Sequence, residues 1–337
     1  CGMENKMRKK WIRGGTFLCL VLLLLSNLNR ILCVKSPHGI DQTRYLYVQP
    51  KNKIDVLFLG SSHVHCNVNT QLLWDEYGMA AYLMTGAEQP LWNSYYNLKE
   101  ALKTQKPKLV VLDMFCPSRF YDDFQPGWAD ENLDGMRISL NKLEAVYTSV
   151  QEEQSHFFLG FTEYHSRYDQ LTTEDFQNFV WNRKTQERWK GYTPLNRHAE
   201  LTEPDMSHVT TSQEMTEKSK EYFEKIVELT KKEGITLALI SGPYLLEERD
   251  QEVYNSIGQL AEKDGLLFWN TNTPAHYREM GLDFSTDYAD HAHLNEAGGA
   301  KYTAYLGKWL SQNYSFPDRR GQKGYESWEN QLMKSGE

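Results

Sequence analysis

The sequence predicts an α/β domain built on a parallel sheet, and two observations support this prediction. Short, almost wholly apolar runs alternate along the chain with segments of helical periodicity. Runs this apolar are typical of strands covered on both faces, and their alternation with helices is typical of a parallel sheet with right-handed crossovers and helices on both faces. The composition, 40% hydrophobic and 24% charged over 337 residues, is that of a globular protein with a large core.

Five strands and four long helices make up the predicted domain, which spans residues 45–315. The strands are predicted at 55–59, 80–84, 109–113, 235–240 and 266–269. The helices are predicted at 92–104, 211–233, 248–264 and 295–313. The second helix has a capping-box start at Thr211 and Glu214, and Gly234 is its stop signal.

Residues 118–210 interrupt this alternation, and we interpret them as a largely helical insertion between the third and fourth strands. The segment is rich in Trp, Tyr, Phe, Asn and charged residues and contains no clear strand. Its aromatic side chains would form a lid or a sugar-stacking wall above the strand ends, or would pack inward within a helical flap. The polar tail, 316–337, is predicted to be flexible and poorly ordered.

The first 36 residues differ from the rest because a basic flank precedes an apolar run from Phe17 to Leu25. Taken as one helix, Trp11 to Val34 is long enough to cross a hydrocarbon core of about 30 Å. No small-residue cleavage site follows the run, so we expect an uncleaved signal anchor rather than a cleaved signal peptide or a buried helix. The basic flank places the N-terminus in the cytoplasm and everything after about Lys35 outside.

Charge and cysteine content narrow the function classes. A net charge of -8 and a pI near 5.8 give no electrostatic reason to expect a nucleic-acid partner. No cofactor is predicted. Only Cys66 and Cys116 lie in the domain, which allows one disulfide or two buried free thiols.

Two polar clusters lie at the carboxyl ends of predicted strands, where the functional residues of open parallel sheets are commonly found. The first is Gly60-Ser61-Ser62-His63, directly after the first strand. Glycine permits a tight turn into a helix, whose first N–H groups face outward. A serine there is a nucleophile only if a base takes its proton.

The second cluster, Asp290-His291-Ala292-His293, lies just ahead of the last predicted helix. Asp290 and His293 are three residues apart, so one turn can hold both side chains toward the same strand ends. A carboxylate beside an imidazole holds its tautomer and stabilises the imidazolium formed when a serine gives up its proton. The cluster therefore supplies the base and the residue that orients it.

In this order and at these places, the clusters resemble the SGNH/GDSL hydrolase superfamily over roughly residues 54–314. The resemblance implies a flavodoxin-like three-layer α/β/α sandwich. The membrane-anchored DltD-like and AlgJ-like proteins of the cell envelope are the most similar branch, because the Gly-Ser-Ser-His turn, Asn93–Glu100 and Lys106–Leu112 resemble theirs.

Carried over by position, the resemblance implies Ser62 as nucleophile, His293 as general base and Asp290 as its orienting residue. Gly86, in the turn after the second strand, would donate its backbone N–H to the oxyanion alongside the Ser62 N–H. The substrate-binding residues are not assigned by any pattern in the sequence.

Two departures from the family pattern stand out. Ser61 occupies the position where the family usually has aspartate, outside the triad. The Gly-x-Asn-Asp block expected after the third strand is absent, which leaves the third oxyanion donor unassigned. Asn93 is one candidate, although an N-cap or helix-surface role suits it better.

Together, the triad, the anchor and the aromatic insertion predict an extracytoplasmic serine esterase or acyltransferase. It would remove or transfer a small acyl group, such as acetyl, on a cell-envelope polysaccharide, peptidoglycan or teichoic-acid-like polymer. A membrane-bound O-acyltransferase is a candidate partner.

Two alternatives remain open at this point. A non-catalytic glycan-binding or assembly component beside a membrane acyltransferase fits the missing oxyanion donor. A zinc-dependent hydrolase would use His63 and His65 with the second cluster. Because His63 and His65 point to opposite sides of an extended segment, the zinc site requires a special loop, and we predict no metal.

Overall fold

The computed structural model describes residues 2–32, 39–120, 122–158, 165–177 and 189–329. Its contacts divide the chain into two units, one of residues 1–35 with 153–182 and one of residues 36–152 with 183–337. The larger unit contains the sheet and the candidate site.

Five parallel strands form one sheet in the order β2-β1-β3-β4-β5. They are β1 (Val56–Gly60), β2 (Ala81–Thr85), β3 (Leu109–Asp113), β4 (Thr236–Ser241) and β5 (Leu267–Asn270). Each predicted strand is confirmed to within one residue. The order is that of flavodoxin-like sheets, so the predicted α/β fold is confirmed.

Apolar side chains occupy both faces of the inner strands, because helices cover both. Every residue of β1, β2 and β3 is buried. The edge strand β5 is an exception, since Leu267 is 49% exposed. The expected burial on both faces therefore holds for the centre of the sheet and fails at this edge.

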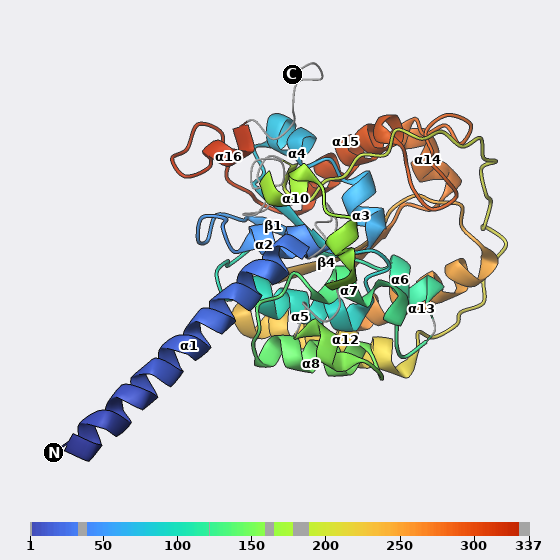
Figure 1. Cartoon of the computed structure of the whole chain (residues 1–337). Coiled ribbons are helices and arrows are strands. Elements are labelled where there is room, and N and C mark those ends of the chain that lie inside the picture. Colours follow the sequence, from blue (N-terminus) through green and yellow to red (C-terminus); the bar gives the residue numbers. More distant parts are fainter. Residues whose placement is uncertain (1, 33–38, 121, 159–164, 178–188, 330–337) are drawn as a thin grey trace. The chain divides into compact units, whose positions relative to one another are not determined.

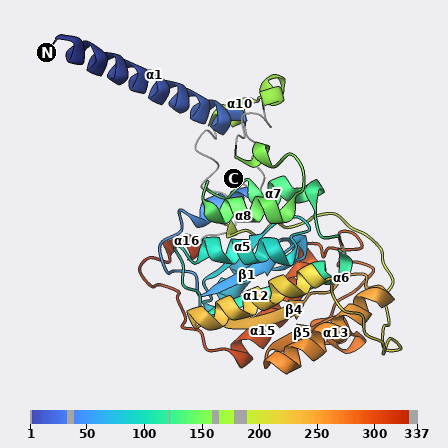
Figure 2. The same cartoon turned by 90° about the horizontal axis from the view of Figure 1, so that it is seen from below.

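Two helical layers enclose the sheet (Figure 1). One contains α3 (Ser62–Asn67), α4 (Thr70–Tyr77) and α15 (Glu296–Asn313). In this layer, Tyr302 and Leu306 of α15 share a core cluster with Val56 and Phe58 of β1. The other layer contains α5 (Leu91–Ala101), α8 (Leu140–Ser149) and α12 (Glu217–Glu233), which lie side by side in Figure 2. Further helices are α2 (Ile40–Leu46), α13 (Glu248–Asp264), α14 (Pro274–Met280) and α16 (Glu326–Glu329).

The predicted helices are present, but the capping box proposed at Thr211 is wrong. α12 begins at Glu217, and its N-cap is Thr216, whose side chain accepts the Ser219 N–H. Thr211 instead donates its hydroxyl to Glu252 of α13 at 2.6 Å. The helix ends at Gly234, as predicted, because φ is +68° there and glycine adopts that conformation without strain.

The described part of the insertion contains several short helices, as predicted, but residues 190–210 contain none. Besides α8 it contains α6 (Phe115–Arg119, which starts ahead of it), η1 (Pro126–Trp128), α7 (Ala129–Leu133), η2 (Gln154–Phe157), η3 (His165–Asp169) and α10 (Thr173–Gln177). Its aromatic residues are divided between the two roles considered above. Phe157 and Tyr192 are buried, whereas Trp128 and Tyr147 are 43% and 58% exposed.

The C-terminal tail differs from its prediction. Arg319 forms a two-pronged ion pair with Asp55, at 2.7 and 2.8 Å. Trp328 in α16 is fully buried. The prediction of a flexible tail is therefore wrong as far as Glu329, and residues 330–337 lie outside the described part of the chain.

The outer edge of β2 is covered by two distant segments. Trp328 donates its indole N–H to the Ala81 carbonyl at 3.0 Å. The backbone N–H of Leu83 donates to the Lys190 carbonyl at 2.9 Å. Backbone groups that an edge strand would otherwise leave free are thus paired within the chain.

The smaller unit is dominated by α1 (Gly2–Leu32). An 18-residue window within Asn5–Asn29 has a mean hydropathy of 1.6, so this helix is long and apolar enough to cross a membrane. A signal sequence has the same properties, so this helix could serve as a membrane anchor or as a signal sequence. Within this unit Leu32 packs against Leu171.

Candidate active site

The turn after β1 presents Ser62 at the start of a helix. Gly60 has φ of +149°, and a Cβ there would lie 2.5 Å from the Asp113 Cβ, so only glycine fits. Ser61 is the N-cap of α3, and its hydroxyl accepts the His63 N–H. Ser62 is the first residue of α3, where the backbone N–H has no intrahelical acceptor.

Ser62, His293 and Asp290 lie in one hydrogen-bonded line. The His293 Nε2 is 2.8 Å from the Ser62 Oγ, and its Nδ1 is 2.8 Å from the Asp290 Oδ1. The side chains of His293 and Asp290 are 20% and 27% exposed, so the line is open to solvent at one side. The structure thus brings together the three residues that the sequence analysis singled out.

Asp290 is held as a carboxylate. Its Oδ1 also accepts the backbone N–H groups of Ala292 and His293, at 2.9 and 3.0 Å, and its Oδ2 accepts from Arg197 at 2.8 Å. Burial opposes ionisation, but the contacts with His293, Ala292 and Arg197 outweigh it and hold the pKa of Asp290 well below its usual range. An ionised carboxylate fixes the Nδ1–H tautomer of the imidazole.

The loop that carries Asp290 and His293 is hydrogen-bonded to the two helices beside it, α3 and α15. Asn67 at the end of α3 accepts the Leu294 N–H at 3.0 Å, and Asn295 caps α15 through the Gly298 N–H. The insertion returns along the other side, where Ala199 and Leu294 each form a bridge with Tyr288. The insertion therefore positions the site and also delivers Arg197 to it, which the sequence analysis did not anticipate.

Gly86 follows β2, and the register pairs Gly60 with Thr85, so Gly86 lies beside the nucleophile turn. A Cβ on Gly86 would lie 2.3 Å from the Asn132 Oδ1. The Asn132 amide is fixed by donating to the carbonyls of Ala87 and Trp128, both at 2.9 Å. Asn132 thus packs on the predicted oxyanion glycine, and the donor role of Gly86 stays a prediction.

Asn93, the candidate for a further oxyanion donor, has another role. It is buried in α5, and its Oδ1 accepts the Ser149 hydroxyl of α8 at 2.6 Å. It therefore joins two helices and is neither an N-cap nor on the helix surface.

A buried carboxyl beneath the turn escaped the sequence analysis. The Asp113 Oδ2 accepts the Ser61 hydroxyl at 3.4 Å, and Asp113 also accepts the N–H groups of Phe115 and Ser61. Burial raises the pKa of Asp113 to about 7, although these hydrogen bonds partly offset the effect.

The histidines considered as zinc ligands have separate environments. His65 lies 3.1 Å from the Thr85 hydroxyl through Nδ1, while His63 stacks on Phe115. Across the described residues, no three His, Cys, Asp or Glu side chains form a cluster able to hold a metal ion. Cys66 and Cys116 are both free and buried.

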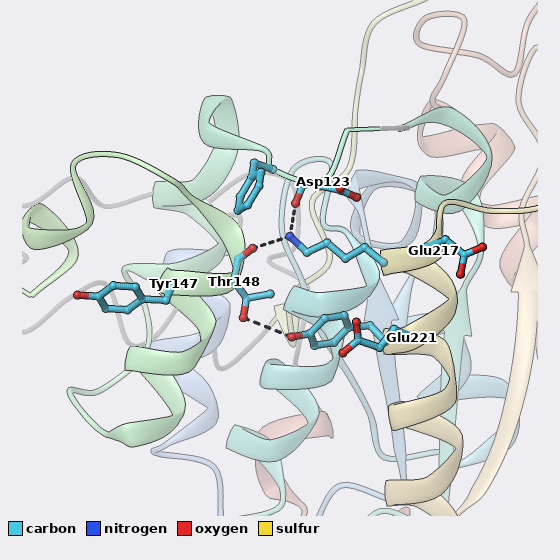
Figure 3. A pocket seen from close by; sticks show the side chains of 8 residues that line it. Asp123, Tyr147, Thr148, Glu217 and Glu221 are labelled. Atoms are coloured by element: carbon cyan, nitrogen blue, oxygen red, sulfur yellow. Dashed lines mark hydrogen bonds between the residues drawn. The ribbon is translucent and has the colours of Figure 1, made fainter.

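An open pocket of about 620 Å³ lies between α8 and α12, and Figure 3 shows Tyr147, Thr148, Glu217 and Glu221 around it. Lys218 fills part of it and donates to the Thr148 carbonyl at 2.7 Å. The pocket contains no residue of the Ser62 line, and we assign no chemistry to it.

Nineteen chains of solved structures resemble this one. No protein-family model matches this sequence, and no curated protein matches it. A crystal structure of a "putative acylhydrolase" from Bacteroides fragilis is similar at 12% identity, covering 81% of this chain and 94% of that one, with a TM-score of 0.38. A likeness this distant carries no argument about function, so the fold rests on strand order and register.

Proposed function

We propose that this protein is a serine esterase or acyltransferase of the SGNH type. The observation that supports it is the continuous line from the Ser62 Oγ through both ring nitrogens of His293 to Asp290, with 2.8 Å at each step. A hydroxyl, an imidazole and a carboxylate in this order are able to activate an alcohol as a nucleophile.

In the proposed reaction, the Ser62 Oγ attacks the carbonyl carbon of an ester while the His293 Nε2 takes its proton. Asp290 stays ionised and stabilises the imidazolium. The backbone N–H groups of Ser62 and Gly86 would hold the negative oxygen of the tetrahedral intermediate. His293 then gives its proton to the departing alcohol, which leaves an acyl group on Ser62.

We propose O-acyl groups of a cell-envelope polysaccharide or a teichoic-acid-like polymer as substrates. Two features support this choice. The apolar helix α1 suits an anchor that holds the domain outside the cytoplasmic membrane. Trp128 lies near the site, because its carbonyl accepts from the Asn132 amide that packs on Gly86. Trp128 is also exposed, and an exposed indole ring can stack on a sugar. A membrane-bound O-acyltransferase is the partner that we propose for a transfer reaction.

The test is covalent labelling of the full chain in detergent by a fluorophosphonate, followed by peptide mass spectrometry. We expect phosphonylation at Ser62 and none in Ser62→Ala. Ser207→Ala, which removes an exposed serine far along the chain, should label as the unchanged protein does. Absence of any Ser62 label would reject the enzyme in favour of a non-catalytic glycan-binding role.

A further inference from the structure

His63, directly after the candidate nucleophile, is a buried histidine whose ring makes no hydrogen bond within the described residues. Its side chain belongs to the second residue of α3, and the residue is 3% exposed. Within the described residues, neither ring nitrogen has a partner. Leaving a buried polar atom unpaired destabilises the folded state, so each such atom in a native protein calls for an explanation such as a catalytic role.

Aromatic rings hold His63 in place. Its ring stacks on Phe115, with centroids 3.6 Å apart and planes at 17°, and it meets Tyr244 edge-on at 4.9 Å. Burial, together with the nearby charges of His293 and Arg119, lowers the pKa of His63 well below its usual value. A neutral imidazole carries one N–H donor and one nitrogen acceptor, so His63 is able to hold a hydroxyl group in either orientation.

The neighbour of His63 on the site side is His293, whose ring centroid lies 5.6 Å away. In the structure the His293 Nε2 is paired with the Ser62 Oγ. Once that oxygen is esterified it has no proton to share, and Nε2 must next accept the proton of the incoming nucleophile. Because the two ring centroids are 5.6 Å apart, an oxygen held by that nitrogen lies close to the ring of His63.

We propose that His63 binds the second nucleophile, the hydroxyl oxygen that attacks the acyl group on Ser62. This inference rests on the proposed function. The oxygen forms a bond to the acyl carbon as its proton passes to the His293 Nε2. The bond from that carbon to the Ser62 Oγ then breaks, and the Oγ recovers the proton from His293. The hydroxyl comes from water in hydrolysis and from a sugar in transfer.

The two half-reactions are separable with p-nitrophenyl acetate and the full chain in detergent. A rapid burst of p-nitrophenol reports acylation of Ser62, and the later steady rate reports removal of the acetyl group. In His63→Phe, which keeps the stacked ring and loses both nitrogens, we expect a steady rate lowered about tenfold, the effect of one lost hydrogen bond. The burst rate should change less than about threefold, because acylation uses only the Ser62 line.

Two variants sharpen the test. His63→Gln restores a donor and an acceptor, and its steady rate should recover toward that of the unchanged protein. His276→Phe makes the same chemical change in α14, where the ring is paired with Tyr305, and should leave both phases unaltered. Adding methyl glucoside distinguishes the source of the hydroxyl, since acetyl glucoside forms only if a sugar reaches Ser62.

The outcomes are distinct. A burst in His63→Phe with a slow steady phase supports the role, and so does its recovery in His63→Gln. Equal slowing of both phases, or no slowing, overturns it. Failure of the unchanged protein to form any acetyl-Ser62 would instead reject the proposed function itself.

Discussion

The His293 Nε2 lies 2.8 Å from the Ser62 Oγ, although 231 positions separate the two residues along the chain. One residue opens the helix after the first strand, and the other closes the loop before the last long helix. If the pair acts as one unit, removing either member should abolish the same step. Ser62→Ala and His293→Ala should each lower kcat on p-nitrophenyl acetate by about 10³-fold or more.

The double variant Ser62→Ala with His293→Ala tests that unit directly. The effects of substituting residues that act together are not additive, so the kcat of the double variant should be no lower than that of the less active single variant. Steady-state rates of the three proteins provide the measurement. Losses that multiply would show two independent contributions and count against a shared proton transfer.

Asp290→Asn should keep the shape of the loop and remove its charge. The amide cannot stabilise the imidazolium and favours the wrong tautomer of His293, so kcat should fall by about 10³–10⁴-fold with little change in KM. Asp283→Asn is the matched control, because the Asp283 Oδ1 accepts hydrogen bonds from Ser285 in the same loop and does not contact the Ser62 line. A similar loss in both variants would indicate loop damage.

Asp113 should make stability depend on pH in an unusual direction. Its pKa is raised from 3.8 to about 7 by burial, so between these values the folded protein holds a proton that the unfolded chain has released. Folding stability therefore falls as the pH rises from about 4 to 7 and levels off above, by an amount on the order of 4 kcal/mol.

The measurement compares this protein with Asp113→Asn, which cannot ionise, by urea unfolding across that range. The difference in unfolding free energy, unchanged protein minus variant, should decrease with rising pH, since other groups cancel. A difference independent of pH would mean that Asp113 ionises as easily in the folded protein as in the unfolded chain.

Gly86→Ala should disturb the loop predicted to hold the oxyanion. Its new methyl would lie 2.3 Å from the Asn132 Oδ1, and Asn132 cannot move without losing two hydrogen bonds. We expect a loss of about 1–3 kcal/mol in stability together with lower kcat. Adding Asn132→Ala makes room, so thermal unfolding of the double variant should occur above that of Gly86→Ala. No recovery would place the strain elsewhere.

The sheet was predictable because a strand that is buried on both faces has an almost continuous run of apolar residues in its sequence. Val110 and Val111 of β3, for example, face opposite helical layers, so the strand is apolar as far as Leu112. The proximity of Ser62 and His293 followed from the rule that parallel strands present their carboxyl ends at one edge. Both inferences need only local pattern and topology.

The missed features depend on partners far away in sequence. Thr211 is not a cap, because the helix begins six residues later at Glu217, and its hydroxyl instead donates to Glu252 of a distant helix. Trp328 looked like part of a loose tail because its acceptor, the Ala81 carbonyl, is 247 positions earlier. Asp113 looked like an ordinary polar strand end, and nothing local indicated that it would lie beneath Ser61.

The indole of Trp328 on the edge of β2 has a consequence during synthesis. The five strands have all left the ribosome by Asn270, yet the carbonyl of Ala81 gains its partner only when residue 328 emerges. Until then the nascent chain leaves this carbonyl unpaired on the edge of β2, where it is able to accept a hydrogen bond from another polypeptide. Chains truncated before α16 should accordingly aggregate during expression even though every strand is present.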